Sequence, residues 1–102
     1  MGLNIDKLLG SLGMISSAGK LVYGEKLFDQ IKLTKVKIVL TTSDMGKSQL
    51  KKINDKAKFY NVKIINNLFD SEQLSKAIGR NNIKSIGIND DNFVKLILKN
   101  IE

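Results

Sequence analysis

The sequence predicts an α/β fold, a three-layer α-β-α sandwich around a four-stranded mixed sheet. Four short runs rich in β-branched residues indicate strands with two covered faces. Around and between them, apolar residues recur at steps of three and four, which is typical of amphipathic helices. Because alternating strands and helices pack in layers around one sheet, we expect residues 1–102 to form a single domain.

The first elements are separated by glycines. Apolar periodicity predicts a helix over 4–17, and Gly19 follows it where a helix commonly ends. A strand is expected over 20–23. Gly24 then breaks that strand just before a helix over 25–33.

The remaining elements continue the alternation. In chain order they are a strand over 37–42, a helix over 47–60, a strand over 62–66, a short helix between Asp70 and Ile78, a strand over 83–88 and a last helix that begins at Asp90 or Asp91. Ser43 and Asp44 are expected to cap the helix that follows them. Asp70 and Gln73 have the spacing of a capping box, and Gly79 is expected to end that short helix.

Residue types that the chain lacks exclude several classes of enzyme. The sequence has no cysteine and no histidine, so disulfides, thiolate and imidazole catalysis and most zinc sites are excluded. Asp90-Asp91 is better explained by helix capping than by acid–base chemistry. Neither a secretory signal nor an apolar run of about 18 residues is present, so we expect a cytoplasmic protein without a membrane partner.

Positive charge is concentrated in the middle of the sequence. The net charge is +7, and residues 20–63 carry 11 lysines against four acidic residues, while the remainder is balanced. Such asymmetry favours a polyanionic partner, although a lysine-rich surface is often only solvated. At Gly24 a strand passes into a helix, whose free N–H groups and positive dipole end attract anions. We interpret this turn as the place where an RNA backbone or base edge binds.

Gly46-Lys47-Ser48 offers a second interpretation, because it has the form of the end of a phosphate-binding P-loop. The full pattern requires a further glycine five residues before Gly46, where the sequence has Thr41. A nucleotide enzyme built on this segment therefore remains the weaker alternative, and helix-start chemistry explains the residues as well.

Several segments, spread over nearly the whole chain, form a recognisable combination. They are Leu9-Gly10, Ala18-Gly19-Lys20-Leu21-Val22-Tyr23-Gly24-Glu25, Lys37-Ile38-Val39-Leu40, Ser43-Asp44, Lys51-Lys52-Ile53-Asn54-Asp55-Lys56, Tyr60-Asn61-Val62 and Leu74-Ser75-Lys76-Ala77-Ile78-Gly79. In this combination the sequence resembles the ribosomal proteins that bind kink-turn RNA, the L-seven-Ae and L-thirty-e superfamily. The most similar branch is that of the small bacterial YlxQ-like proteins.

The resemblance implies a function as well as a fold. It implies a non-enzymatic protein that binds bulged or kinked RNA, with ribosomal or other structured RNA and ribosomal proteins as partners. It also implies no cofactor, metal or small-molecule substrate. In the family, the turn into the second helix carries Gly-x-Asn-Glu and a lysine three residues later, which read sheared G·A pairs. A loop after the Ala-x-Gly helix end touches the bulged nucleotide.

Carried onto this sequence, Gly24 matches the family's glycine. Lys26 stands at the asparagine, Leu27 at the glutamate and Gln30 at the lysine. Lys26 can only donate hydrogen bonds and Leu27 can make none, which shifts the site from base reading towards holding the backbone. A protein-interaction module of the same fold is the alternative that Leu27 favours.

The expected RNA-binding residues come from four parts of the sequence. They are Lys20, Gly24, Glu25, Lys26, Gln30, Lys47, Lys51, Gly79, Arg80 and Asn81, with Asn82 in the same loop as the last three. Irregular RNA suits such a site, because a kink or bulge exposes base edges that an A-form duplex hides.

Overall fold

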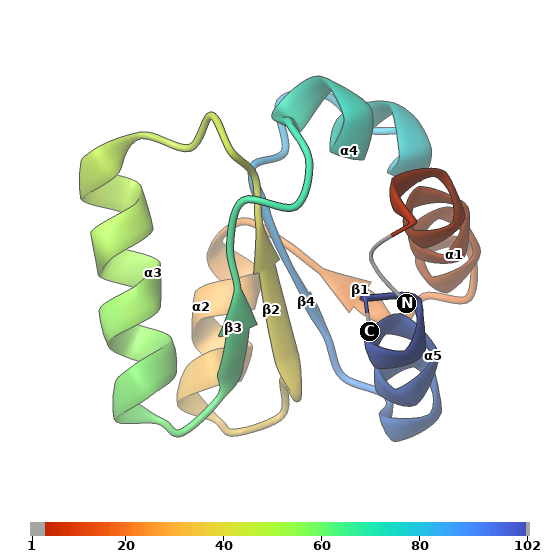
Figure 1. Cartoon of the computed structure of the whole chain (residues 1–102). Helices are drawn as coiled ribbons and strands as arrows, with labels where there is room; N and C mark the ends of the chain where they lie inside the picture. Colours follow the sequence, from red (N-terminus) through yellow and green to blue (C-terminus); the bar gives the residue numbers. More distant parts are fainter. Residues whose placement is uncertain (1–3, 102) are drawn as a thin grey trace.

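A computed structural model describes residues 4–101 and has the expected α/β architecture (Figure 1). Its elements are α1 (Ile5–Ser17), β1 (Leu21–Val22), α2 (Glu25–Lys32), β2 (Ile38–Thr41), α3 (Lys47–Phe59), β3 (Lys63–Ile65), α4 (Ser71–Ile78), β4 (Ser85–Ile88) and α5 (Asp91–Ile101). Each element that the sequence predicts is present, with ends that differ by one or two residues. Residues 1–3, on which the expectation about a secretory signal partly rests, lie outside the described range.

The four strands form one mixed sheet in the order β1-β4-β2-β3. β2 and β3 are parallel, with Val39 opposite Ile64, whereas β4 runs antiparallel to both β1 and β2. Gly87 of β4 lies opposite Val22 on one side and Val39 on the other. The first strand in sequence therefore lies beside the last, which brings the β1–α2 turn close to the segment that precedes β4.

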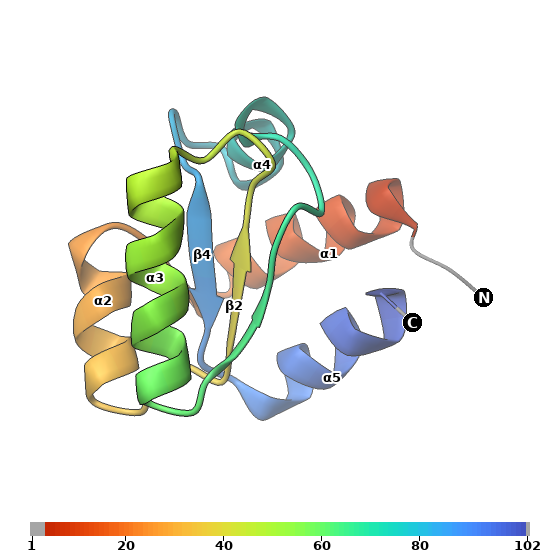
Figure 2. The same ribbon diagram turned by 60° about the vertical axis from the view of Figure 1, so that its left-hand side comes forward.

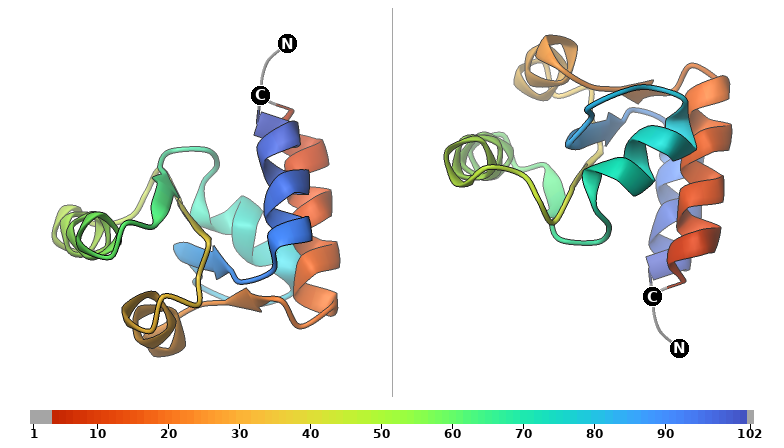
Figure 3. Two further views of the ribbon diagram at one scale, coloured as in Figure 1. Left: turned by 90° about the horizontal axis from the view of Figure 1, so that it is seen from below. Right: turned by 90° about the horizontal axis from the view of Figure 1, so that it is seen from above.

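Helices cover both faces of the sheet, as Figures 2 and 3 show. α2 and α3 lie on one face, and α1, α4 and α5 lie on the other. Each face has its own core: Leu27, Ile31 and Ile53 pack against Val39 on the first, and helices α1, α4 and α5 pack against Ile38 and other strand residues on the second. All four residues of β2 are buried, as expected of a central strand with two covered faces.

Most helix ends follow the local sequence. The capping box between Asp70 and Gln73 is confirmed, with each side chain bonded to the other residue's backbone N–H. Gly19 and Gly79 end α1 and α4 in the left-handed conformation, at φ +73° and +69°. Of the two candidates for the last helix, Asp90 is the cap, because its carboxylate accepts from the N–H groups that follow.

The expected cap of α3 is wrong. α3 begins at Lys47 with Gly46 as its N-cap, and no side chain of the described residues caps it. Asp44 lies three residues before the helix and instead accepts hydrogen bonds from the N–H and hydroxyl of Ser71, at 2.9 and 2.5 Å. A capping side chain must directly precede its helix, and here the turn carries Asp44 to the start of α4.

Candidate nucleic-acid interface

The turn from β1 into α2 has a backbone conformation that favours glycine. Gly24 is the N-cap of α2, with φ +66° and ψ −146°, a region that other residues enter only with strain. No side chain among the residues that the structure describes caps this end. The first backbone N–H groups of α2 therefore point out of the helix, where its dipole favours an anion.

The start of α3 lies close to that turn. Gly46 and Gly24 line the same hollow, which has a volume of about 410 Å³. Its wall is partly apolar and partly polar, and its remaining lining residues are Phe28, Met45, Gln49, Asn82, Ile83, Lys84 and Ser85. Two helix N-termini without a side-chain cap among residues 4–101 thus open on one cavity.

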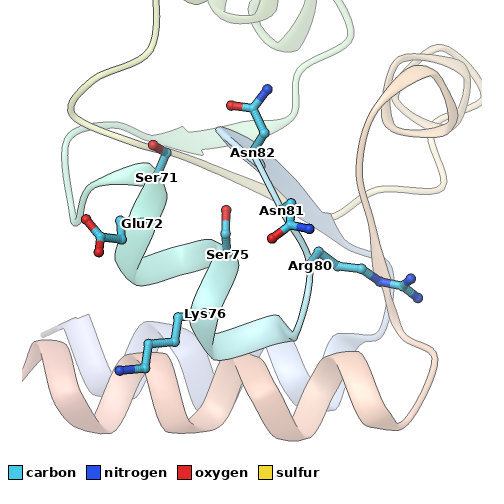
Figure 4. Close-up of a pocket in the computed structure, with 7 residues that line it drawn as sticks. All are labelled: Ser71, Glu72, Ser75, Lys76, Arg80, Asn81 and Asn82. Atoms are coloured by element: carbon cyan, nitrogen blue, oxygen red, sulfur yellow. The ribbon is translucent and has the colours of Figure 1, made fainter.

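The loop between α4 and β4 forms the third side of the site. Arg80 extends away from α4 towards the segment that joins β1 to α2 (Figure 4). Its guanidinium lies 5.8 Å from the centre of the Tyr23 ring, and Arg80, Tyr23 and Lys26 line a second hollow. The same loop is fixed at Ile83, whose N–H donates to the buried Ser75 hydroxyl at 2.9 Å. Arg80 and Lys26 therefore border a hollow of their own, which adjoins the first one along the chain at Tyr23 and Gly24.

A third hollow lies beside the same loop. Arg80, Asn81 and Asn82 line it together with Ser71, Ser75, Glu72 and Lys76 of α4. In Figure 4 the side chain of Asn82 points away from α4, and those of Glu72 and Lys76 point away from the loop. The loop therefore presents amide and guanidinium groups on its outer side.

The Asp44–Ser71 contact connects the loops that border the site. Asp44 lies between β2 and α3, and Ser71 is the first residue of α4. The hydroxyl of Ser71 is the main cause that lowers the pKa of Asp44 from 3.8 to about 2, with a further contribution from the Ser71 N–H and an opposing one from desolvation. The carboxylate is therefore charged throughout the physiological pH range and holds the β2–α3 turn against α4.

The structure brings together part of the expected site. Gly24, Lys26, Arg80 and Asn81 line adjacent hollows, and Glu25 and Gly79 adjoin them as the first residue of α2 and the last-turn glycine of α4. Lys47 begins α3 next to Gly46 and is exposed. Lys51 lies one turn further along, where its ammonium pairs with the Asp55 carboxylate at 2.8 Å.

Two expected residues do not line these hollows, although Lys20 lies between Gly19 and Leu21, which line the hollow of Arg80. The carbonyl of Lys20 accepts from the N–H of Asn89 at 3.4 Å, at the end of the β1–β4 ladder away from Gly24. Gln30 accepts from the Asn89 side chain at 3.3 Å, near the same end. Leu27, at the position of the family's glutamate, is fully buried in the core under α2 and α3. The residues that line the hollows at Gly24 and Arg80 include none of Lys20, Gln30 and Leu27.

The hollow at Gly24 also contains residues that the sequence did not single out. Phe28, Met45, Gln49 and Lys84 line it, and they come from α2, the β2–α3 turn, α3 and the residue before β4. A general rule could have found these residues, because the loops at one edge of an α/β sheet commonly form its ligand site. Using it requires the strand order, which local sequence patterns do not supply.

Residues 4–101 lack the features of several other classes of site. No three acidic side chains there are grouped as metal ligands would be. None of the helices in that range combines the length and the apolar character needed to cross a bilayer. Thr41, where a P-loop would have its first glycine, is a buried strand residue whose hydroxyl donates to Asn66.

Comparisons with known proteins show relatives of similar length. No protein-family model matches the chain. A curated protein of Enterococcus faecium, named RNA-binding protein YlxQ, is 34% identical over 100 residues, which cover 97% of this chain and 95% of that one. A solved protein of unknown function from Bacillus halodurans C is 28% identical, with a TM-score of 0.84 over 91% of this chain and 94% of that one.

A more distant structure shares the fold alone. The 15.5kD RNA binding protein of Giardia lamblia is 13% identical, with a TM-score of 0.75 over 96% of this chain and 87% of that one. The identity to the Enterococcus faecium protein confirms the resemblance to the small bacterial YlxQ-like proteins. The chain belongs to the YlxQ family.

Proposed function

We propose that this protein binds structured RNA at a bulge or kink, in the cytoplasm and in association with the ribosome, without catalysing a reaction. Its relative in Enterococcus faecium is named an RNA-binding protein. The observation that carries the proposal is the hollow on which the N-termini of α2 and α3 both open, at Gly24 and Gly46. Outward-pointing N–H groups and two positive dipole ends at one place favour an anionic ligand.

The cations around the hollow support a polynucleotide rather than a single anion. Lys26 and Arg80 line the adjoining hollow, Lys84 lines the first, and Lys47 is exposed beside Gly46. They come from α2, α3 and the α4–β4 loop, so the positive charge is spread over an edge of the molecule. Spread cations of this kind contact successive phosphates of one backbone.

The hollow itself suits an unstacked base. Phe28 and Met45 give it an apolar side, and the amides of Gln49 and Asn82 add donors and acceptors. A base that leaves its stack needs such a combination, because its ring requires an apolar surface and its edge requires hydrogen bonds. Bulged RNA supplies an unstacked base without the cost of opening a duplex, so we propose bulged RNA over regular duplex.

The alternatives have less support. Leu27 would favour a protein-interaction module only if its side chain faced a partner. Because the side chain is fully buried, it does not support that alternative. Its identity therefore reflects packing against the sheet and gives no information about a lost RNA contact. The P-loop interpretation of Gly46-Lys47-Ser48 is weakened because a buried strand residue occupies the place of the first glycine.

Salt-dependent binding to an RNA hairpin tests the proposal. The RNA carries a bulge flanked by G·A pairs, and a fully paired hairpin of the same length serves for comparison. With about four phosphate contacts, log Kd against log salt concentration should change with a slope of magnitude about 3 to 4. Lys26→Ala and Arg80→Ala should each weaken binding about fivefold and reduce that slope by about 1.

Lys99→Ala is the matched control, because Lys99 is exposed on α5 in the opposite helical layer. It removes one positive charge and should leave the slope unchanged. A flat salt response, or equal binding of paired and bulged hairpins, would contradict the proposal. Nucleotide binding by the parent protein that Lys47→Ala abolishes would favour the P-loop interpretation instead.

A further inference from the structure

A second cationic surface lies between α2 and α3, and we call it the α2–α3 face. It consists of Phe28, Lys52, Lys56 and Phe59. The ammonium groups of Lys52 and Lys56 lie 5.4 and 5.7 Å from the centre of the Phe28 ring. Both distances are within the range of a cation–π interaction, which holds the two lysines in place over the ring.

Phe59 leaves its aromatic ring open to solvent. It is 80% exposed, the highest value among the exposed large hydrophobic residues of the described chain. Its ring and that of Tyr60 are nearly perpendicular, with centroids 4.9 Å apart, so this contact orients the Phe59 ring while most of its surface stays accessible. Phe59 follows Lys56 by three positions and Lys52 by seven, a spacing that places all three on one side of α3.

The face is continuous with the proposed RNA site. Phe28 lines the hollow that Gly24 and Gly46 also line, and α2 and α3 lie side by side from that end downwards (Figure 2). α3 has 13 residues, so at 1.5 Å per residue it extends about 20 Å away from the hollow. A strand that leaves the hollow along this face would pass Lys52 and Lys56 before it reaches Phe59.

We propose that the α2–α3 face binds a single-stranded RNA segment that continues from the bulge. The phosphates lie along Lys52 and Lys56, and a base stacks on Phe59. Cationic grooves with exposed aromatic rings bind single strands in this way, because each base has a face that stacks and each phosphate carries a charge. The proposal rests on the proposed function and adds a second contact region to it.

The charges on α3 favour RNA over a protein partner. The helix carries five lysines and one acidic residue, Asp55, which pairs with Lys51 on another side of the helix. Protein–protein interfaces are depleted of lysine and enriched in apolar residues at their centre. On the α2–α3 face the aromatic rings are flanked by lysine ammonium groups instead, which complements a polyanion.

The test compares the bulged hairpin with the same hairpin carrying a single-stranded overhang of about six nucleotides, attached in turn to its 5′ and 3′ ends. The overhang should raise the affinity of the parent protein about tenfold at one of the two ends, because stacking contributes on that order per base. Phe59→Ala and the double variant Lys52→Ala/Lys56→Ala should lose most of this gain. Both should bind the hairpin without overhang as the parent does.

The double variant Lys58→Ala/Lys63→Ala is the charge-matched control. Lys58 is two positions from Lys56, so it points about 200° away around the helix, and Lys63 is exposed on the edge strand β3. This control should retain the gain. The inference is overturned if neither overhang strengthens binding, which is the result expected of a face that docks a protein. It is also overturned if Phe59→Ala retains the gain, as the control should. If the parent protein does not bind the hairpin without overhang, this result would instead contradict the proposed function.

Discussion

The Asp44 side chain holds the β2–α3 turn in place through a residue that is distant in the sequence. Its carboxylate accepts two hydrogen bonds from Ser71, 27 positions away in the sequence. Sequence patterns predicted a cap for the next helix, since they describe only nearby residues. The partner of Asp44 follows from the fold, because the β2–α3 turn and the start of α4 meet above the sheet.

The pH dependence of stability should report this contact. The pKa of Asp44 is lowered in the folded state from 3.8 to about 2, so the ionised carboxylate stabilises the fold above the unfolded value. That contribution is lost as the pH falls from about 4 to about 2. In urea titrations, Asp44→Asn should be less stable than the parent at pH 7, and the difference should shrink over this window.

Ser71→Ala supplies the matched variant for that measurement. It removes the hydroxyl that is the main cause of the lowered pKa but leaves the carboxylate in place. Its stability should depend less on pH between about 4 and 2 than that of the parent. A constant difference between parent and Asp44→Asn across the whole window would show that the ionised form gains nothing from folding.

At the scale of elements, the packing of α1 against α4 depends on a glycine. A Cβ atom at Gly13 would lie 2.8 Å from the backbone carbonyl oxygen of Ala77, whereas a Cβ at Gly10 would have no neighbour within 4 Å. Both glycines lie in α1, so replacement by alanine brings the same gain in helix propensity. The structure thus separates a glycine that allows close packing from one that only weakens its helix.

The two alanine variants should therefore change stability in opposite directions. Gly10→Ala should raise the free energy of unfolding by about 0.5 to 1 kcal/mol. Gly13→Ala should lower it, because a backbone carbonyl cannot move as a flexible side chain can, and overpacking costs about 1 to 3 kcal/mol. Chemical denaturation of the two variants measures the difference directly, and equal stabilisation by both would refute the close contact at Gly13.

For the whole molecule, local patterns in the sequence were enough to predict the order and type of the elements. The run Ile38–Thr41 consists of three aliphatic residues and a β-branched threonine, and Asp70 with Gln73 marks a helix start, so these features required no tertiary information. The meeting of Gly24 with Gly46 and of Tyr23 with Arg80 depends on the strand order β1-β4-β2-β3. No local pattern contains that order, which is why the sequence predicts only part of the lining of the hollow and does not show that Gln30 lies beside Asn89.

The uneven distribution of charge along the sequence places the positive charge on one side of the folded molecule. Residues 20–63 carry the whole net charge of +7 and form β1, α2, β2, α3 and the start of β3. The helices of this segment make up one outer layer, while α1, α4 and α5 make up the other (Figure 3). A polyanion should therefore approach from the side of α2 and α3, since long-range attraction follows the charge distribution.

Two double variants with equal net charge test this orientation. Lys47→Gln/Lys51→Gln removes two charges from α3, and Lys95→Gln/Lys99→Gln removes two exposed charges from α5. With bulged RNA, the first pair should slow association and reduce the magnitude of the salt slope by about 1, because Lys47 supplies one of the proposed phosphate contacts and each contact contributes about 0.9. The second pair should change neither quantity beyond a small common effect of net charge. If both pairs slow association equally at low salt, steering depends on total charge alone, and the α2–α3 side has no preferred role in the approach.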